Sequence, residues 1–302
     1  MAILQGPLDQ GALASTLIAL VKGKENPGED RQASQRPDLS VLADRRILLV
    51  EDHLINQQVA HDMFGAVGLV ADVANDGREA LFMTESRRYD LILMDMQMPV
   101  MGGIDATRAI RRLPGYADVA IIAMTANVTE SDKAACLEAG MNDHLGKPVT
   151  PDALYAILHR WLPASEGRAA VAATEQALSV PTTGVASIDL HIPDITGLNV
   201  EFGVRNALGN RDRYRQLLVK LIQAHEHDSA LIEENLRKGK ISEARIAAHS
   251  LKGAAATLGA EDIFRAAAAI EAHLKATPPT SPETELPVLG EAIQRLKAAL
   301  QL

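Results

Sequence analysis

Acidic residues, a hydroxyl and a lysine recur directly after short apolar runs in the first half of the chain. Glu51 and Asp52 follow ILLV, Asp95 follows LILM, Thr125 follows IIAM, and Lys147 follows HLG. Clustered carboxylates repel one another and favour a hard divalent cation such as Mg²⁺. A carboxylate can also act as a nucleophile and form an acyl phosphate. A lysine beside it would neutralise the charge of the transferring oxygens, and a hydroxyl would donate a hydrogen bond to one of them. These residues therefore predict a phosphoryl-transfer site.

A histidine in the second half has an unusual neighbourhood, AAHSLKGAAATLGA. His249 and Lys252 are three residues apart and share one helix face, so the ammonium group can approach a phosphate on the imidazole. Gly253 in mid-helix costs about 1 kcal/mol relative to alanine. Its presence predicts that another surface approaches closely. The other helical histidines are expected on solvated faces: His61, His159, His225, His227 and His273.

The first half alternates short apolar runs with amphipathic stretches. The runs lie at 47–50, 69–73, 91–94, 119–124 and 144–145, and the stretches at 54–66, 77–87, 104–112, 131–139 and 151–162. This alternation predicts a doubly wound α/β domain with a five-stranded parallel sheet. Ligands bind outside the carboxyl ends of such strands, so the residues after the runs should converge there. We expect Lys147 to be exposed at this edge, so that Lys147→Ala leaves the fold intact.

The second half lacks strand patterns. Helices are predicted at 200–208, 211–238, 240–258, 260–276 and 284–301, separated by Gly209, Gly239, Gly259 and Pro278-Pro279. Glycine just beyond a helix and proline after it are ordinary stop signals. Helices joined by short loops indicate an all-α domain, a four-helix bundle.

The motifs carry a resemblance to known families. VEDHLINQ, LILMDMQMPVMGG, AMTAN and HLGKP resemble the receiver domains of two-component signalling, which have a flavodoxin-like fold. HSLKG resembles the motif of histidine phosphotransfer (HPt) domains, and Glu271 falls where that family places a comparable residue. Two positions depart from the receiver pattern. His144 stands where an aromatic switch residue is usual, and His53 stands where hybrid kinases commonly have Asn.

The resemblance implies roles for particular residues. Asp95 would be the phospho-acceptor, and Mg²⁺ would be held by Glu51, Asp52, Asp95 and the backbone carbonyl of Gln97. Thr125 and Lys147 would contact the phosphoryl group. His249 would accept it through Nε2, with Lys252 nearby.

The resemblance and the patterns together predict a domain plan. A receiver domain spans 44–162 and an HPt domain 188–302, with linkers at 22–43 and 163–187. Residues 6–17 align with 147–158, which suggests that 1–21 is the tail of a preceding degenerate receiver domain. The alternative is an unrelated amphipathic helix. A flexible linker permits contact between the two phosphorylation sites without requiring it.

These features predict the C-terminal part of a hybrid sensor histidine kinase. Phosphate would pass from an upstream histidine kinase domain to Asp95, then to His249, and then to a downstream response regulator receiver. No nucleotide-binding motif is recognisable, so the fragment should not phosphorylate itself from ATP. One alternative is a regulatory module whose phosphorylated Asp95 alters a protein interface. A Mg²⁺-dependent phosphohydrolase is disfavoured by the HSLKG helix.

Composition excludes other classes. A net charge of −9 argues against nucleic-acid binding, which requires a basic surface. No apolar run approaches the roughly 20 residues of a membrane span, and no signal peptide is visible. A single cysteine, Cys136, suits a reducing compartment. We therefore expect a cytoplasmic fragment without membrane contact of its own, whether or not a longer parent is anchored.

Overall fold

The computed structural model describes residues 42, 44–125, 130–162 and 195–302, with the side chains of 130–132 left aside. Asp38–Leu302 forms one compact unit, which contains both expected domains. The expected linker 163–187, nearly all of the linker 22–43, and the proposed domain tail at 1–21 lie outside the described residues. Those parts of the domain plan stay predictions.

The first half forms the predicted doubly wound sheet. Its strands are β1 (Ile47–Val50), β2 (Ala71–Ala74), β3 (Leu91–Asp95), β4 (Ala120–Thr125) and β5 (Asp143–Gly146). All are parallel, in the order β2-β1-β3-β4-β5. The order reverses at β1, and a crevice at such a switch point is the usual ligand site of an open α/β sheet.

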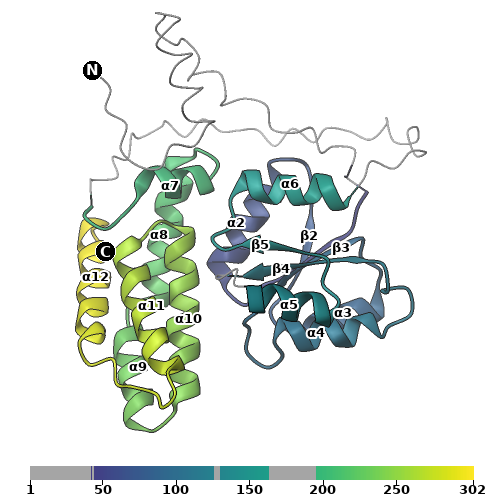
Figure 1. Cartoon of the computed structure of the whole chain (residues 1–302). Helices are drawn as coiled ribbons and strands as arrows, with labels where there is room; N and C mark the ends of the chain where they lie inside the picture. The colour runs from purple at the N-terminus through teal and green to yellow at the C-terminus, as the bar shows by residue number, and fades with distance from the viewer. Residues whose placement is uncertain (1–41, 43, 126–129, 163–194) are drawn as a thin grey trace, which may run out of the picture. The chain divides into compact units, whose positions relative to one another are not determined.

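Helices cover both faces of the sheet, as Figure 1 shows. α2 (Leu54–Gly65) and α6 (Pro151–Trp161) lie on one face; α3 (Gly77–Ser86), α4 (Gly103–Arg111) and α5 (Glu130–Ala139) lie on the other. Ile47 and Leu49 pack into the cluster under α2 and α6, whereas Leu48 and Val50 pack into the opposite cluster. Because both faces are covered, every residue of β1 is buried, which explains the continuous apolar run.

The second half is helical. It comprises α7 (Val200–Asn206), α8 (Arg211–His225), α9 (Asp228–Arg237), α10 (Ile241–Thr257), α11 (Glu261–Lys275) and α12 (Glu285–Ala299). Helices α8 to α12 build the bundle (Figure 1). α8 and α9 together form one of its four sides, and α10, α11 and α12 form the other three. The four-helix-bundle prediction is confirmed. Among the described residues, no helix has the length and apolar character that crossing a membrane requires.

The prediction of one continuous helix at 211–238 was wrong. Residues 226 and 227 separate α8 from α9. His225 Nδ1 lies 2.7 Å from Asp228 Oδ2, and both side chains are nearly buried. Asp228 is also the first residue of α9, where a negative charge is favoured by the helix dipole. A local polar contact therefore outweighs the weak propensity for an unbroken helix.

The turn between α10 and α11 depends on Gly259. Its φ is +69°, and a Cβ there would lie 2.6 Å from the backbone oxygen of Asn199. Glycine alone suits both the left-handed backbone and the close approach. This turn returns α11 antiparallel alongside α10, which brings residues 249 and 271 together.

Candidate functional site

Three carboxylates meet at the carboxyl edge of the sheet. Glu51 and Asp52 come directly after β1, and Asp95 is the last residue of the adjacent strand β3. Their carboxylate oxygens lie within 4.8 Å of one another. Gly103 permits the tight turn behind Asp95, because a Cβ there would lie 2.3 Å from the Asp95 carbonyl oxygen. The strand pairing thus converts distant sequence positions into one acidic cluster.

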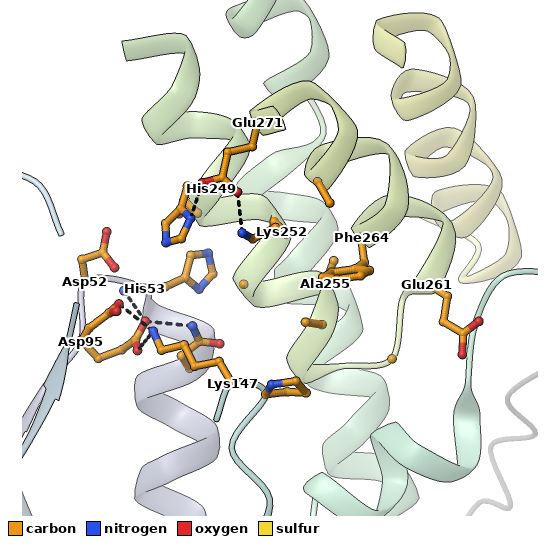
Figure 2. A pocket seen from close by; sticks show the side chains of 18 of the residues that line it. Asp52, His53, Asp95, Lys147, His249, Lys252, Ala255, Glu261, Phe264 and Glu271 are labelled. Atoms are coloured by element: carbon orange, nitrogen blue, oxygen red, sulfur yellow. Dashed lines mark hydrogen bonds and ion pairs between the residues drawn. The ribbon is translucent and has the colours of Figure 1, made fainter. Parts of the chain in front are cut away.

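Lys147 is buried within this cluster. Its Nζ lies 2.6 Å from Glu51 Oε2 and 2.6 Å from Asp95 Oδ2, and its side chain is 12% exposed. The expectation of an exposed lysine was therefore wrong. Lys147 follows β5, and its backbone N–H donates to the carbonyl of Thr125 at 2.8 Å. This places its side chain where the two buried carboxylates attract the ammonium group (Figure 2).

The charges of this cluster are not balanced. Burial raises the pKa of Asp95 to about 6, with Lys147 opposing and Glu51 adding to the rise. Burial, and then Glu51, also raises the pKa of Asp52 to about 6. Burial lowers the pKa of Lys147, but Glu51 and Asp95 together outweigh it, so the ammonium stays charged. One lysine faces three carboxylates, and a hard divalent cation with oxygen ligands fits the remaining negative charge.

The other predicted receiver residues lie around this cluster. Thr125 is half-buried at the end of β4. The backbone N–H of Gln97 donates to Asp95 Oδ1 at 3.2 Å, while the metal role of the Gln97 carbonyl stays a prediction. His144 is exposed, with Nδ1 3.7 Å from Asp143 Oδ1, and its suggested switch role stays a prediction too.

His249 lies on α10 beside a conspicuous buried carboxylate. Its Nδ1 is 3.0 Å from Glu271 Oε1 on α11, and its side chain is 19% exposed. Glu271 also accepts from Lys252, which contacts Oε2, and from Lys275 Nζ at 2.6 Å. The buried stripe of α10 includes Ala244, Ala248, Leu251 and Ala255. That stripe fixes the opposite face of α10, where His249 and Lys252 are only partly buried.

Glu271 determines which nitrogen of His249 is free. Burial would raise the pKa of Glu271, but hydrogen bonds from His249, Lys252 and Lys275 lower it well below its usual value. An ionised carboxylate only accepts hydrogen bonds. Nδ1 of His249 therefore carries the ring proton, and Nε2 keeps a lone pair. The helix pattern alone gave no sign of Glu271, because it lies one helix away.

The two sites share one cavity. Asp95 and Lys147 line it from the receiver side, and His249 and Lys252 line it from α10 (Figure 2). Its volume is about 470 Å³. Gly253 also faces it, and a Cβ there would lie 3.5 Å from Asn56 Nδ2. A surface does approach this glycine, as the sequence predicted, although alanine would meet it at ordinary contact distance.

Helix α2 carries most polar contacts between the two halves. Asp62 accepts two hydrogen bonds from the Arg213 guanidinium, at 2.6 and 3.1 Å. Lys220 donates to Gln58 at 2.7 Å, completing a second contact to α8. On α10, Thr257 donates to Asn56 Oδ1 at 2.8 Å. The buried cluster under α2 and α6 is continuous with the bundle core. Polar and apolar contacts therefore both fix α2 against the bundle.

His53 and His225 form a buried contact that sequence reasoning missed. The expectation of a solvated His225 was wrong, since both residues are 7% exposed. Their Nε2 atoms lie 2.8 Å apart. Burial, followed by His225 and Lys147, lowers the pKa of His53 to about 3, so this ring is neutral near pH 7. The only weak signal in the sequence was the three-residue spacing of His225 and Asp228.

Known proteins resemble both halves. The family described as response regulator receiver domain matches residues 47–159, and the Hpt domain family matches 216–299. "Two-component response regulator 24" of Arabidopsis thaliana is 37% identical over 134 residues, 43% of this chain and 93% of that protein. "Hybrid signal transduction histidine kinase B" of Dictyostelium discoideum is 41% identical over 129 residues, 39% of this chain. "Sensor histidine kinase RcsC" of Salmonella typhi is 37% identical over 147 residues, 49% of this chain. The matches span 7% and 14% of these two kinases.

Proposed function

Because this chain belongs to the two-component phosphorelay family and combines a receiver with an Hpt domain, we propose that Asp95 passes phosphate to His249 within one chain. The observation that carries the proposal is the single cavity lined by both residues. An upstream kinase histidine would supply the phosphate, and a downstream receiver would take it. A longer parent of the hybrid-kinase type, working in the cytoplasm, would contain this region.

The chemistry follows from the two side chains. An Asp95 oxygen attacks the phosphorus of a phosphohistidine, the P–N bond breaks, and an acyl phosphate forms. The Nε2 lone pair of His249 then attacks the same phosphorus. The P–O bond to Asp95 breaks, its electron pair returns to the carboxylate, and the phosphoryl group moves to Nε2. The Glu271 carboxylate accepts from Nδ1–H and stabilises the positive charge that develops on the ring.

Charge neutralisation comes from the receiver side. Lys147 Nζ, which lies 2.6 Å from Asp95 Oδ2, would contact a phosphoryl oxygen, and the Thr125 hydroxyl would donate to another. Glu51, Asp52, Asp95 and the Gln97 carbonyl would hold Mg²⁺, which supplies further positive charge to the phosphoryl oxygens when bound.

The direct test uses a labelled acyl-phosphate donor with the full chain and Mg²⁺. We expect two classes of label: a base-labile acyl phosphate and an acid-labile, base-stable phosphohistidine. Asp95→Asn should remove both, because the histidine receives its phosphate through Asp95. Phosphohistidine that forms in Asp95→Asn would contradict the order of transfer. Label confined to the acyl phosphate would instead favour the regulatory module.

The metal assignment predicts that Asp52→Asn weakens Mg²⁺ binding by about tenfold or more, equivalent to about 1.4 kcal/mol. The reason is that the variant loses one of the three carboxylates of the cluster, whose combined negative charge one lysine does not balance. Calorimetric titration with Mg²⁺ measures the affinity. Asp105→Asn is the matched control, since Asp105 is in the same domain and is 76% exposed. Equal affinities in both variants would refute the assignment.

Glu271 is expected to act as a positioning residue. Glu271→Gln keeps an acceptor for His249 Nδ1–H but loses the charge, so transfer to His249 should slow about tenfold. The lowered pKa of Glu271 means that its stabilising effect is present above the unfolded pKa, about 4.3. It is lost as pH falls towards the folded value. The difference in free energy of unfolding between the unaltered chain and Glu271→Gln should therefore shrink as the pH falls.

Chemical unfolding at pH 7 and pH 3 measures that difference, and transfer rates are measured alongside. Glu283→Gln is the control, because Glu283 is exposed on the same bundle. A difference that is unchanged between the two pH values would contradict the role of the carboxylate charge. An unchanged transfer rate would contradict its role in positioning His249.

A further inference from the structure

His53 occupies an unusual place between the acidic cluster and the bundle. It directly follows Asp52 and caps α2, where its Nδ1 accepts from the backbone N–H of Ile55 at 3.2 Å. Its Nε2 points to His225, the last residue of α8. Figure 2 shows His53 among the residues that line the cavity, as His249 does. The two rings are nearly parallel, with an interplanar angle of 11° and centroids 5.0 Å apart. On the far side, His225 Nδ1 meets Asp228 Oδ2 at 2.7 Å.

The protons of this group can be assigned from its neighbours. Since Ile55 N–H donates to His53 Nδ1, the ring proton of His53 must lie on Nε2. That N–H then donates to Nε2 of His225, which must be unprotonated. The proton of His225 therefore lies on Nδ1 and is donated to the Asp228 carboxylate. All hydrogen bonds run in one direction, from the α2 backbone to a carboxylate in the bundle.

Such an arrangement discriminates between partners. Asp62 and Gln58 contact the long and at least partly exposed side chains of Arg213 and Lys220 on α8. The rings of His53 and His225, in contrast, are both buried. Burying a polar group without a partner costs free energy, so a receiver lacking the donor at this position is penalised. A shorter side chain such as asparagine would leave Nε2 of His225 without its donor.

We propose that His53 is a pairing determinant, whose hydrogen bond to the His225–Asp228 pair makes this bundle select its own receiver. The bundle thereby favours a receiver with a ring N–H donor after the acidic pair over one with asparagine there. This inference rests on the proposed relay, since pairing matters through the Asp95-to-His249 step.

A double-mutant cycle in the full chain tests the pairing. The variants are His53→Asn, His225→Ala and the double variant, and each transfer rate is normalised to the amount of labelled Asp95. Each single change should slow transfer about tenfold, the loss of one buried hydrogen bond. The double variant should be no slower than His225→Ala alone, because the contact with His53 is already lost in that variant. An additive loss of about a hundredfold, or no loss in the single variants, overturns the proposal.

A matched control and a second measurement separate this contact from folding and from the relay. His227→Ala should change nothing, because that side chain is 89% exposed and lies two residues from His225. Nitrogen NMR of labelled histidines should show protonated Nε2 in His53 and protonated Nδ1 in His225. A scalar coupling between the two Nε2 atoms should be present in the unaltered chain and absent in His53→Asn. If no phosphohistidine ever forms, the relay fails, yet the NMR result still decides the contact; opposite tautomers overturn it.

Discussion

The His249→Gln chain should accept label on Asp95 and form no phosphohistidine. Glutamine keeps helix propensity and much of the side-chain size, but it has no nucleophilic nitrogen. His249 is partly exposed and outside the buried stripe of α10, so the bundle should tolerate the change. Glutamine can also donate to Glu271, which keeps that buried carboxylate paired. The label should therefore remain entirely as a base-labile acyl phosphate.

Base- and acid-stability tests of the label distinguish the two forms in this experiment. His227→Gln is the matched control on the same bundle, and it should yield both forms, because His227 is exposed. Phosphohistidine that persists in His249→Gln would show that another histidine carries the relay. If Asp95 can no longer be labelled, the acidic site depends on the bundle more than the contacts at α2 indicate.

Lys147→Ala should destabilise the metal-free protein by about 3 kcal/mol at pH 8. Removing one partner of a buried ion pair typically costs about 3–5 kcal/mol, because the remaining charges stay buried without compensation. Lys147 is the cation between Glu51 and Asp95, whose side chains are 3% and 4% exposed. The lower end of that range applies, since carboxylates can take up protons. Urea unfolding in the presence of a chelator measures the loss.

The pH dependence of this loss follows from the raised pKa values. The folded protein binds protons on Asp52 and Asp95 more tightly than the unfolded chain, because their folded pKa values are about 6. Lowering the pH through 6 protonates these groups, removes their repulsion and favours the folded state. The difference between Lys147→Ala and the unaltered protein should therefore shrink at pH 5. Mg²⁺ should also reduce it, since the ion binds the same carboxylates.

Lys238→Ala provides the control for both conditions. Lys238 pairs with Glu234 at 2.7 Å on an exposed helix face, and its side chain is 57% exposed. Such a pair contributes little, so the control should change stability by about 0.5 kcal/mol or less at either pH. Equal effects of the two substitutions would contradict a buried, ion-paired Lys147. A loss that grows in acid would contradict carboxylate repulsion as its cause.

Local patterns determined the architecture. Short apolar runs between amphipathic helices predicted all five strands, because a sheet covered on both faces buries nearly every residue of its central strands. Strand β2 differs most, running from residue 71 to 74 rather than 69 to 73. The convergence of Glu51, Asp52, Asp95 and Lys147 also followed from sequence, since parallel strands place their carboxyl ends at one edge. The resemblance added the family and the expected roles.

Only the tertiary structure determined the properties that depend on contacts between residues far apart in the sequence. The burial of Lys147 depends on Asp95 and Glu51, which are 52 and 96 residues away in the sequence. The free nitrogen of His249 depends on the Glu271 carboxylate on another helix. The contact between His225 and His53 joins residues 172 apart. Sequence periodicity reports only which face of an element is apolar. It carries no information about which distant polar group contacts that face. In this chain, such contacts determine the charge state of the acidic cluster, the position of the proton on His249 and the pairing of the two domains.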